Sequence, residues 1–268
     1  MDTDNLLFAF GLTLFAGLAT GVGSFIGLLH KKFNPKFLAA SLGFSAGVMI
    51  YVSLVEIFAK AKDSLSLEYG DKTGYWMTVV GFFAGIALIG IIDKLIPSGE
   101  NPHELNKTKD YDNSKHAKTK LMRLGLFSAL AIGIHNFPEG LATFLAAIEN
   151  PTLGISIAVA IAIHNIPEGL AISVPIYYAT GSKKKAFILS FLSGLAEPIG
   201  ALVGYFILQY FFSDATFGLV FAAVAGIMVY ISLDELLPTA EEYGEHHIAI
   251  YGLIAGMALM SVSLVLMA

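Results

Sequence analysis

The chain has 268 residues, of which 56% are hydrophobic and only 14% are charged, and its mean hydropathy is +0.71. Soluble chains carry about 25% charged residues, so this composition excludes an ordinary soluble domain and indicates a polytopic membrane protein. The net charge of −5 argues against nucleic acid as a partner, and the absence of cysteine excludes disulfides and thiolate metal sites.

Eight apolar segments are long enough to cross a bilayer, for which a helix needs about 20 mostly apolar residues. They predict an all-α fold in a single transmembrane domain that covers residues 1–268. The residues before the first segment are acidic and lack the basic start of a signal peptide, so we expect this segment to be retained. The predicted spans are 6–29, 37–59, 75–96, 124–148, 153–178, 186–212, 217–237 and 248–267.

The connections between the spans differ strongly in charge. Alternate connections hold thirteen of the sixteen Lys and Arg residues, including those of a long polar loop at about 97–120. Because basic residues accumulate on the cytoplasmic side, we expect this set of connections, and the loop, to be cytoplasmic and both termini to lie outside. The loop is poor in apolar residues, so we also expect it to be disordered.

Several spans match one another in sequence. Residues 47–56 match 226–235, residues 17–20 match 194–197, and residues 81–88 match 252–259. The members of each pair are separated by an odd number of spans and would cross the membrane in opposite directions. We therefore predict an inverted repeat of three spans, a central pair and three spans, as many secondary transporters have.

The most informative feature is a hexapeptide in the central pair. It reads His-Asn-Phe-Pro-Glu-Gly at 135–140 and His-Asn-Ile-Pro-Glu-Gly at 164–169. Ionisable residues in such apolar surroundings are costly and usually functional. On a helix, the His and the Asn lie four and three residues before the Glu, so all three side chains share one face. Imidazole with carboxylate suits zinc, iron or manganese, so the motif predicts an intramembrane metal site rather than two His that merely link helices.

A third carboxylate, Glu197, also lies deep in an apolar segment. Buried carboxylates need compensating positive charge, and no Lys lies deep in a span, so a bound cation is the simplest source. The set has room for two adjacent ions bridged by Glu139 and Glu168. We predict that one ion is bound by His135, Glu139, His164 and Glu168, and the other by Asn136, Glu139, Asn165, Glu168 and Glu197.

With these paired motifs, eight predicted spans and a long loop after the third, the chain resembles the ZIP family of metal transporters over its whole length. The resemblance implies uptake of zinc across the cell membrane, with iron, manganese, cobalt and cadmium as further substrates. It implies a binuclear site in spans four, five and six, on the residues named above, and no cofactor besides the transported ions. The partners it implies are divalent metal ions, the lipid bilayer and a second copy of the chain in a homodimer.

Two alternative functions stay open, a metal-selective channel and a membrane di-metal enzyme. A channel would use the same residues as a carrier. The enzyme is disfavoured because the Glu-x-x-His spacing of di-iron bundles and the His-Glu-x-x-His motif are both absent. Outside the predicted metal site, several residues near span ends are either binding sites where the metal enters or leaves, or ordinary solvated groups. These are Glu56, Asp234, Glu235, His246 and His247.

Overall fold

The computed structural model describes residues 3–29, 34–95, 114–149, 151–206, 213–243 and 246–267, and within these ranges it contains helices and their connections but no strand. This confirms the predicted all-α class. The α-helices are α1 (Thr3–Gly27), α2 (Pro35–Val52), α3 (Phe58–Tyr69), α4 (Asp71–Leu95), α5 (Ser114–Glu149), α6 (Pro151–Thr180), α7 (Lys183–Gly194), α8 (Ala196–Phe206), α9 (Asp214–Ile231), α10 (Leu237–Tyr243) and α11 (His246–Met267).

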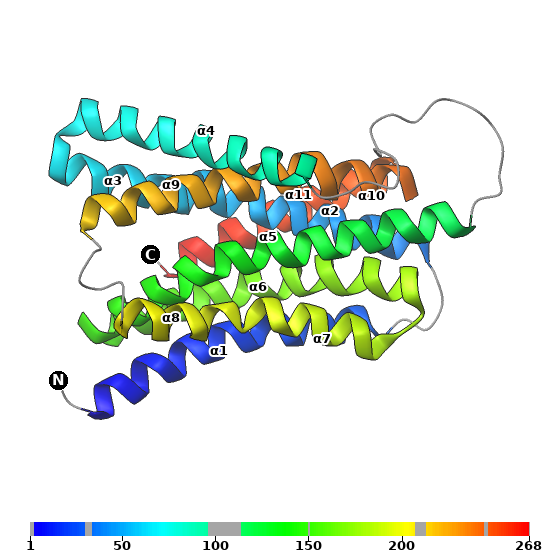
Figure 1. Cartoon of the computed structure of the whole chain (residues 1–268), viewed down its shortest axis with the longest axis horizontal. Coiled ribbons are helices and arrows are strands. Elements are labelled where there is room, and N and C mark those ends of the chain that lie inside the picture. The colour runs from blue at the N-terminus through cyan, green and yellow to red at the C-terminus, as the bar shows by residue number, and fades with distance from the viewer. Residues whose placement is uncertain are drawn as a thin grey trace.

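Seven helical segments of the described chain are long and apolar enough to cross a membrane, and each overlaps one predicted span over most of its length. The remaining predicted span, 124–148, lies within α5. The middle of α5 carries the first hexapeptide, whose polar side chains lower the mean hydropathy of this helix. α5 nevertheless packs along α6 through the body of the molecule (Figure 1).

At two predicted boundaries the helices extend further than the apolar segments, because polar residues continue them. The second span was expected to end at residue 59, but the helix continues to Tyr69, where Gly70 ends it with a φ of 80°. The long loop was expected to reach residue 120, but α5 already begins at Ser114. Hydropathy detects only apolar helix, whereas Lys, Glu and Ala are good helix formers outside the bilayer. The rest of that loop lies outside the described residues.

Two matched segments share a local structure that the sequence did not predict. Each contains a single π-helical turn, η1 at Ser53–Ile57 and η3 at Ser232–Leu236. The turns occupy equivalent positions in the matched segments 47–56 and 226–235. The hydroxyl groups of Ser53 and Ser232 each donate to the carbonyl oxygen four residues earlier, at 2.6 and 2.8 Å. The 3+2+3 arrangement stays a prediction, but these two matched segments have the same backbone structure.

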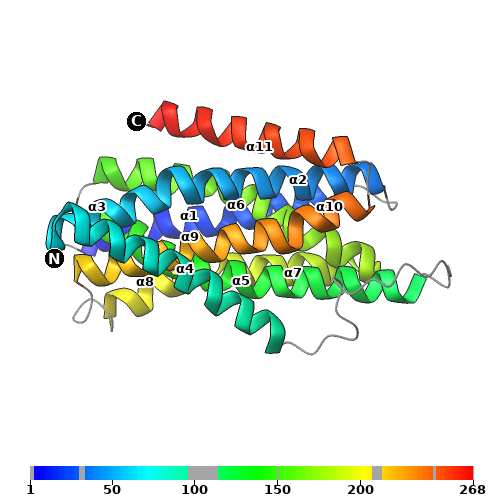
Figure 2. The ribbon, with the colours of Figure 1, turned by 90° about the horizontal axis from the view of Figure 1, so that it is seen from above.

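The helices group into two bundles that lie side by side (Figures 1 and 2). The site bundle comprises α1, α5, α6, α7 and α8. The companion bundle comprises the remaining helices, with η1 and η3. Contacts of α2 with α6 and of α5 with α9 join the two bundles. In Figure 1, α1 starts and α11 ends on the left, and α4 ends and α5 starts on the right. We call the right-hand end, where the basic residues at the starts of α5 and α7 lie, the lysine end.

The site bundle has an apolar cluster towards each end. Towards the lysine end, Ile132, Ile172 and Ala186 belong to one cluster of buried side chains. Towards the other end, Phe144 and Ala201 belong to another. On α5, α6 and the α7–α8 segment, the ionisable residues of the predicted metal site fall at or between the levels of these clusters. The centre is therefore a polar layer inside an otherwise apolar bundle.

Candidate metal centre

The structure brings all seven predicted residues into the interior of the site bundle. Three come from α5, three from α6 and one from the first turn of α8. Each is at most 3% exposed to solvent. The residues are His135, Asn136, Glu139, His164, Asn165, Glu168 and Glu197.

The two copies of the hexapeptide pair crosswise through their imidazoles and carboxylates. His135 Nε2 lies 2.7 Å from Glu168 Oε1, and His164 Nε2 lies 3.2 Å from Glu139 Oε2. The imidazole rings are 6.3 Å apart between centroids. Within the first copy, His135 Nδ1 lies 3.6 Å from Glu139 Oε1, one helical turn further on. The predicted same-face spacing is thus confirmed for this pair, and the crosswise contacts hold α5 and α6 together at the centre.

The two asparagines connect the centre to the helices around it. The Asn136 amide donates to the backbone carbonyl of Ser193 at 3.2 Å, and the Asn165 amide donates to that of Ala16 at 2.9 Å. The Asn165 amide also donates to the carboxylate of Glu197. Glu197 therefore joins the hexapeptides through Asn165.

The glycine that closes each hexapeptide allows close helix packing beside the centre. A Cβ at Gly140 would overlap the backbone carbonyl of Glu197, and a Cβ at Gly169 would overlap that of Thr20. Small residues let helix backbones approach closely inside membranes. Gly140 brings α8 against α5, and Gly169 brings α1 against α6, so four helices pack closely around the centre.

Several polar atoms of the centre are buried without a hydrogen-bond partner. Such atoms are rare in native proteins and each costs about 1–3 kcal/mol. Here they are ring nitrogens, amide oxygens and carboxylate oxygens, which are the atom types that bind divalent metals. The unpartnered atoms are His135 Nδ1, Asn136 Oδ1, His164 Nδ1, Asn165 Oδ1, Glu168 Oε2 and Glu197 Oε2.

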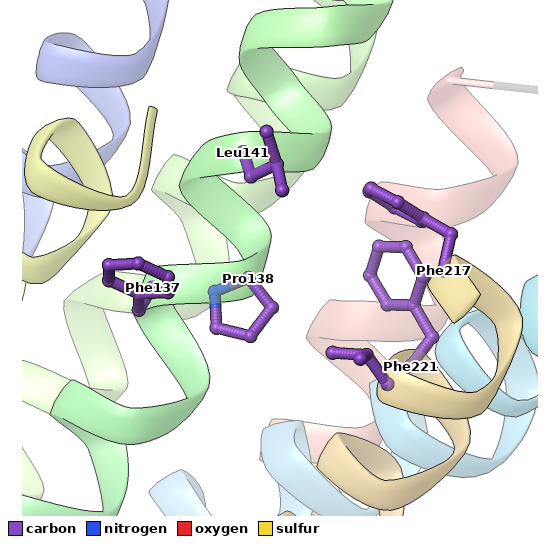
Figure 3. Close-up of a pocket in the computed structure, with 6 residues that line it drawn as sticks. Phe137, Pro138, Leu141, Phe217 and Phe221 are labelled. Carbon is purple, nitrogen blue, oxygen red and sulfur yellow. The ribbon is translucent and has the colours of Figure 1, made fainter. Parts of the chain in front are cut away.

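An apolar cavity of about 30 Å³ lies beside the first hexapeptide, between α5 and α9. Figure 3 shows Pro138 and Leu141 of α5 on the side towards Phe217 and Phe221 of α9, and Phe137 of α5 also lines the cavity. The lining has no polar side chain, so this cavity supplies no metal ligand. It lies instead where the two bundles meet.

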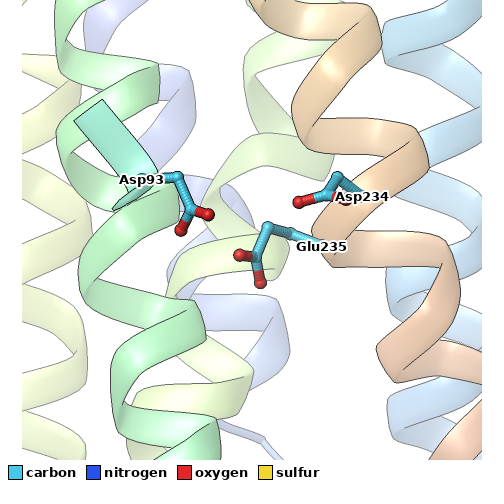
Figure 4. Close-up of side chains that lie close together, drawn as sticks. All are labelled: Asp93, Asp234 and Glu235. Atoms are coloured by element: carbon cyan, nitrogen blue, oxygen red, sulfur yellow. The ribbon is translucent and has the colours of Figure 1, made fainter. Parts of the chain in front are cut away.

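A second group of carboxylates lies in the companion bundle. One oxygen each of Asp93, Asp234 and Glu235 come within 4.8 Å of one another, and Figure 4 shows the three side chains converging. Glu235 is only 7% exposed. Arg123 of the site bundle contacts this group, with Nη2 2.7 Å from Asp93 Oδ1. We call these four residues the arginine cluster.

Sequence reasoning singled out Asp234 and Glu235 but missed Asp93 and Arg123 as their neighbours. Both lie at span edges, where ionisable residues are common, and no spacing signal links two residues on either side of a long loop. Of the other candidates, Glu56 pairs with Lys60 at 2.5 Å. Glu241 contacts His246 at 3.0 Å on the surface.

Comparison with known proteins gives a consistent result. The family model for ZIP zinc transporters matches residues 94–264. The zinc transporter ZupT of Chlorobaculum parvum is 71% identical over 98% of this chain and 99% of its own length. The zinc transporter ZupT of Chlorobium chlorochromatii is also 71% identical, with the same coverage. That of Lysinibacillus sphaericus is 63% identical over 98% of both chains.

Proposed function

Because the chain belongs to the ZIP family of zinc transporters, we propose that it takes up zinc across the cell membrane and that the centre in the site bundle carries the ion. The observation that carries this proposal is the set of buried, unpartnered ligand atoms contributed by α5, α6 and α8. The names of the relatives support zinc as the substrate.

The charge of the centre supports a divalent cargo. Glu139, Glu168 and Glu197 are buried together, and no Lys or Arg of the described chain forms an ion pair with them. Uncompensated buried carboxylates are strongly destabilising. Without a bound cation, buried carboxylates favour the protonated form. Metal binds to the deprotonated form, so in this proposal loading exchanges metal for protons.

Two adjacent ions fit the available atoms. In this proposal, the two imidazoles with Glu139 and Glu168 bind one ion. The two asparagine oxygens with Glu197 bind the other, and Glu139 and Glu168 bridge both. A bound ion would replace the crosswise His–Glu hydrogen bonds. Amide and carboxylate oxygens hold zinc less firmly than thiolates do, which allows the ion to leave again.

The direction and selectivity of transport follow from the same features. The lysine end is proposed to face the cytoplasm because basic residues accumulate on that side, so zinc enters from the opposite end. Imidazole and carboxylate also accept iron, manganese, cobalt and cadmium, which we propose as competing substrates. The homodimer stays a prediction that cross-linking in the membrane would test. The chain is proposed to be a transporter without enzymatic activity.

Zinc uptake into proteoliposomes tests this function. The wild-type protein should show saturable uptake, and the Glu139→Ala/Glu168→Ala variant should be reduced to background. Asp63→Asn is the matched control, because the Asp63 side chain is 72% exposed and lies outside the centre. Full uptake by the double variant would refute the site. Zinc binding without flux would instead indicate an enzyme or a sensor, and uptake without saturation would indicate a channel.

A further inference from the structure

Thr20 of α1 occupies a position that corresponds to that of Glu197 at the start of α8. The segments Gly-Leu-Ala-Thr at 17–20 and Gly-Leu-Ala-Glu at 194–197 match in sequence. Their glycines pack reciprocally, since a Cβ at Gly17 would contact the carbonyl of Gly194 and a Cβ at Gly194 would contact that of Gly17. The two segments therefore approach each other as equivalents.

The contacts to the hexapeptides repeat in the same register. Asn165 donates to the carbonyl four residues before Thr20, and Asn136 donates to the carbonyl four residues before Glu197. Gly169 packs against the carbonyl of Thr20, and Gly140 packs against that of Glu197. Four independent contacts thus place Thr20 and Glu197 at equivalent positions around the centre.

The hydroxyl of Thr20 has no hydrogen-bond partner although the residue is fully buried. A helical Thr commonly donates to the carbonyl four residues earlier. Thr13 does so to Ala9 at 3.0 Å, and Thr143 does so to Glu139 at 2.9 Å. For Thr20 the corresponding carbonyl belongs to Ala16, which accepts from Asn165 instead.

The side chain of Thr20 points towards the region where α7 meets α8. A Cβ at Gly194, three residues before Glu197, would lie 2.9 Å from Thr20 Cβ and 3.0 Å from Thr20 Oγ1. In the first hexapeptide, the Oδ1 oxygen of Asn136 is also buried and has no hydrogen-bond partner. Asn165, its counterpart in the second hexapeptide, donates to Glu197.

We propose that Thr20 is a further binding residue of the centre, an uncharged oxygen ligand that takes on the α1 side the place that Glu197 takes on the α8 side. This inference rests on the proposed function. It makes the centre asymmetric, with a carboxylate on one side and a hydroxyl on the other.

Substitutions at Thr20 test the proposal in the uptake assay. Thr20→Val keeps the shape but removes the hydroxyl, and it should raise the KM for zinc about tenfold, as expected for the loss of one polar contact to a charged group. Thr20→Ser keeps the hydroxyl and should behave like wild type. Thr20→Glu completes the symmetry and should lower both the KM and the maximal rate, because a fourth carboxylate holds zinc more tightly and slows its release.

Thr13→Val is the matched control, because Thr13 is a buried threonine of the same helix whose hydroxyl already has an acceptor. An unchanged KM in Thr20→Val, or an equal change in Thr13→Val and Thr20→Val, would overturn the proposal. If Thr20→Val fails to fold, a Thr20→Ser protein with a KM raised about tenfold would also overturn it. Wild-type protein that neither binds nor transports zinc would refute the proposed function itself, which is a distinct outcome.

Discussion

The candidate metal centre and the arginine cluster each gather three carboxylates, but among the described residues a Lys or Arg side chain pairs only with the arginine cluster. In the arginine cluster, Arg123 reaches across from the site bundle to Asp93. In the centre, the carboxylates find only imidazoles and an amide. This difference indicates that the carboxylates of the centre, unlike those of the arginine cluster, need a bound ion to compensate their charge. The centre fits the proposed metal cargo, whereas the charge of the arginine cluster is partly neutralised by Arg123.

The two regions also differ in where they lie. The centre draws all its ligands from one bundle, so an ion bound there can stay with that bundle as a unit. The arginine cluster joins the two bundles, since α4 and η3 supply the carboxylates and α5 supplies Arg123. A second ion pair also joins the two bundles at this end of α5. It is formed by Lys120 of α5 and Glu242 of α10.

The largest effect is expected when the centre loses a carboxylate. Glu168→Gln removes the charge that faces His135 and one of the two proposed bridging groups. Uptake should fall more than about 100-fold, because replacing even a residue that only supports a metal ligand costs about 10- to 100-fold. Initial rates of zinc uptake at saturating zinc measure this. A rate within threefold of wild type would remove Glu168 from the site.

A smaller effect is expected at Glu197, which is proposed to contact only one of the two ions. Glu197→Gln preserves the size of the side chain and its contact with Asn165. The zinc content of the purified protein should fall from two ions to one per chain, and uptake should fall about tenfold. Equilibrium dialysis with metal analysis measures the content. Two ions retained in the variant would contradict the binuclear assignment.

Removing the cation from the arginine cluster should make it resemble the centre. Arg123→Gln leaves three neighbouring carboxylates without their arginine and should lower the free energy of unfolding by about 2 kcal/mol, less than for a fully buried pair because both partners are slightly exposed. Divalent metal should restore part of this loss. Thermal unfolding with and without zinc measures both effects.

The double variant Arg123→Gln/Asp93→Asn is the control for that experiment. It removes both members of the ion pair, so its loss of stability should be smaller than the sum of the two single losses. Strictly additive losses would show that Arg123 does not compensate the cluster, and the comparison between the two regions would fail.

The smallest effect is expected at Glu56, where the chain also provides a cation. Glu56 pairs with Lys60 one helical turn away, and Lys60 is half exposed. Such helical pairs contribute about 0.3–0.5 kcal/mol. Glu56→Gln should therefore change zinc uptake less than twofold in the same assay. A tenfold loss would instead make Glu56 an entrance station for the metal.

The centre was predictable from the sequence because polar residues stand out in apolar segments. Both hexapeptides and Glu197 interrupt predicted spans, and helical spacing alone placed each His on the same face as its Glu. The helical class and the approximate spans followed from apolar run length in the same way. These signals are local, and the structure reproduces them closely.

The remaining features depend on contacts that have no local signal. The extension of the helix to Tyr69 and the start of α5 at Ser114 involve polar residues that hydropathy does not identify as helix. The π-helical turns are a change of hydrogen-bond register that any of several sequences can adopt. The contact between Arg123 and Asp93 joins residues of different bundles, so it depends on how the two bundles pack against each other.

The claim that zinc binds at the centre is tested most directly by X-ray absorption at the zinc edge of the purified, zinc-loaded protein. The account predicts nitrogen and oxygen ligands with imidazole scattering at about 2.0–2.1 Å, and loss of that scattering in His135→Gln/His164→Gln. The exposed pair His246 and His247 is an alternative source of imidazole. Imidazole scattering that persists in the His135→Gln/His164→Gln variant and disappears in His246→Gln/His247→Gln would contradict the account.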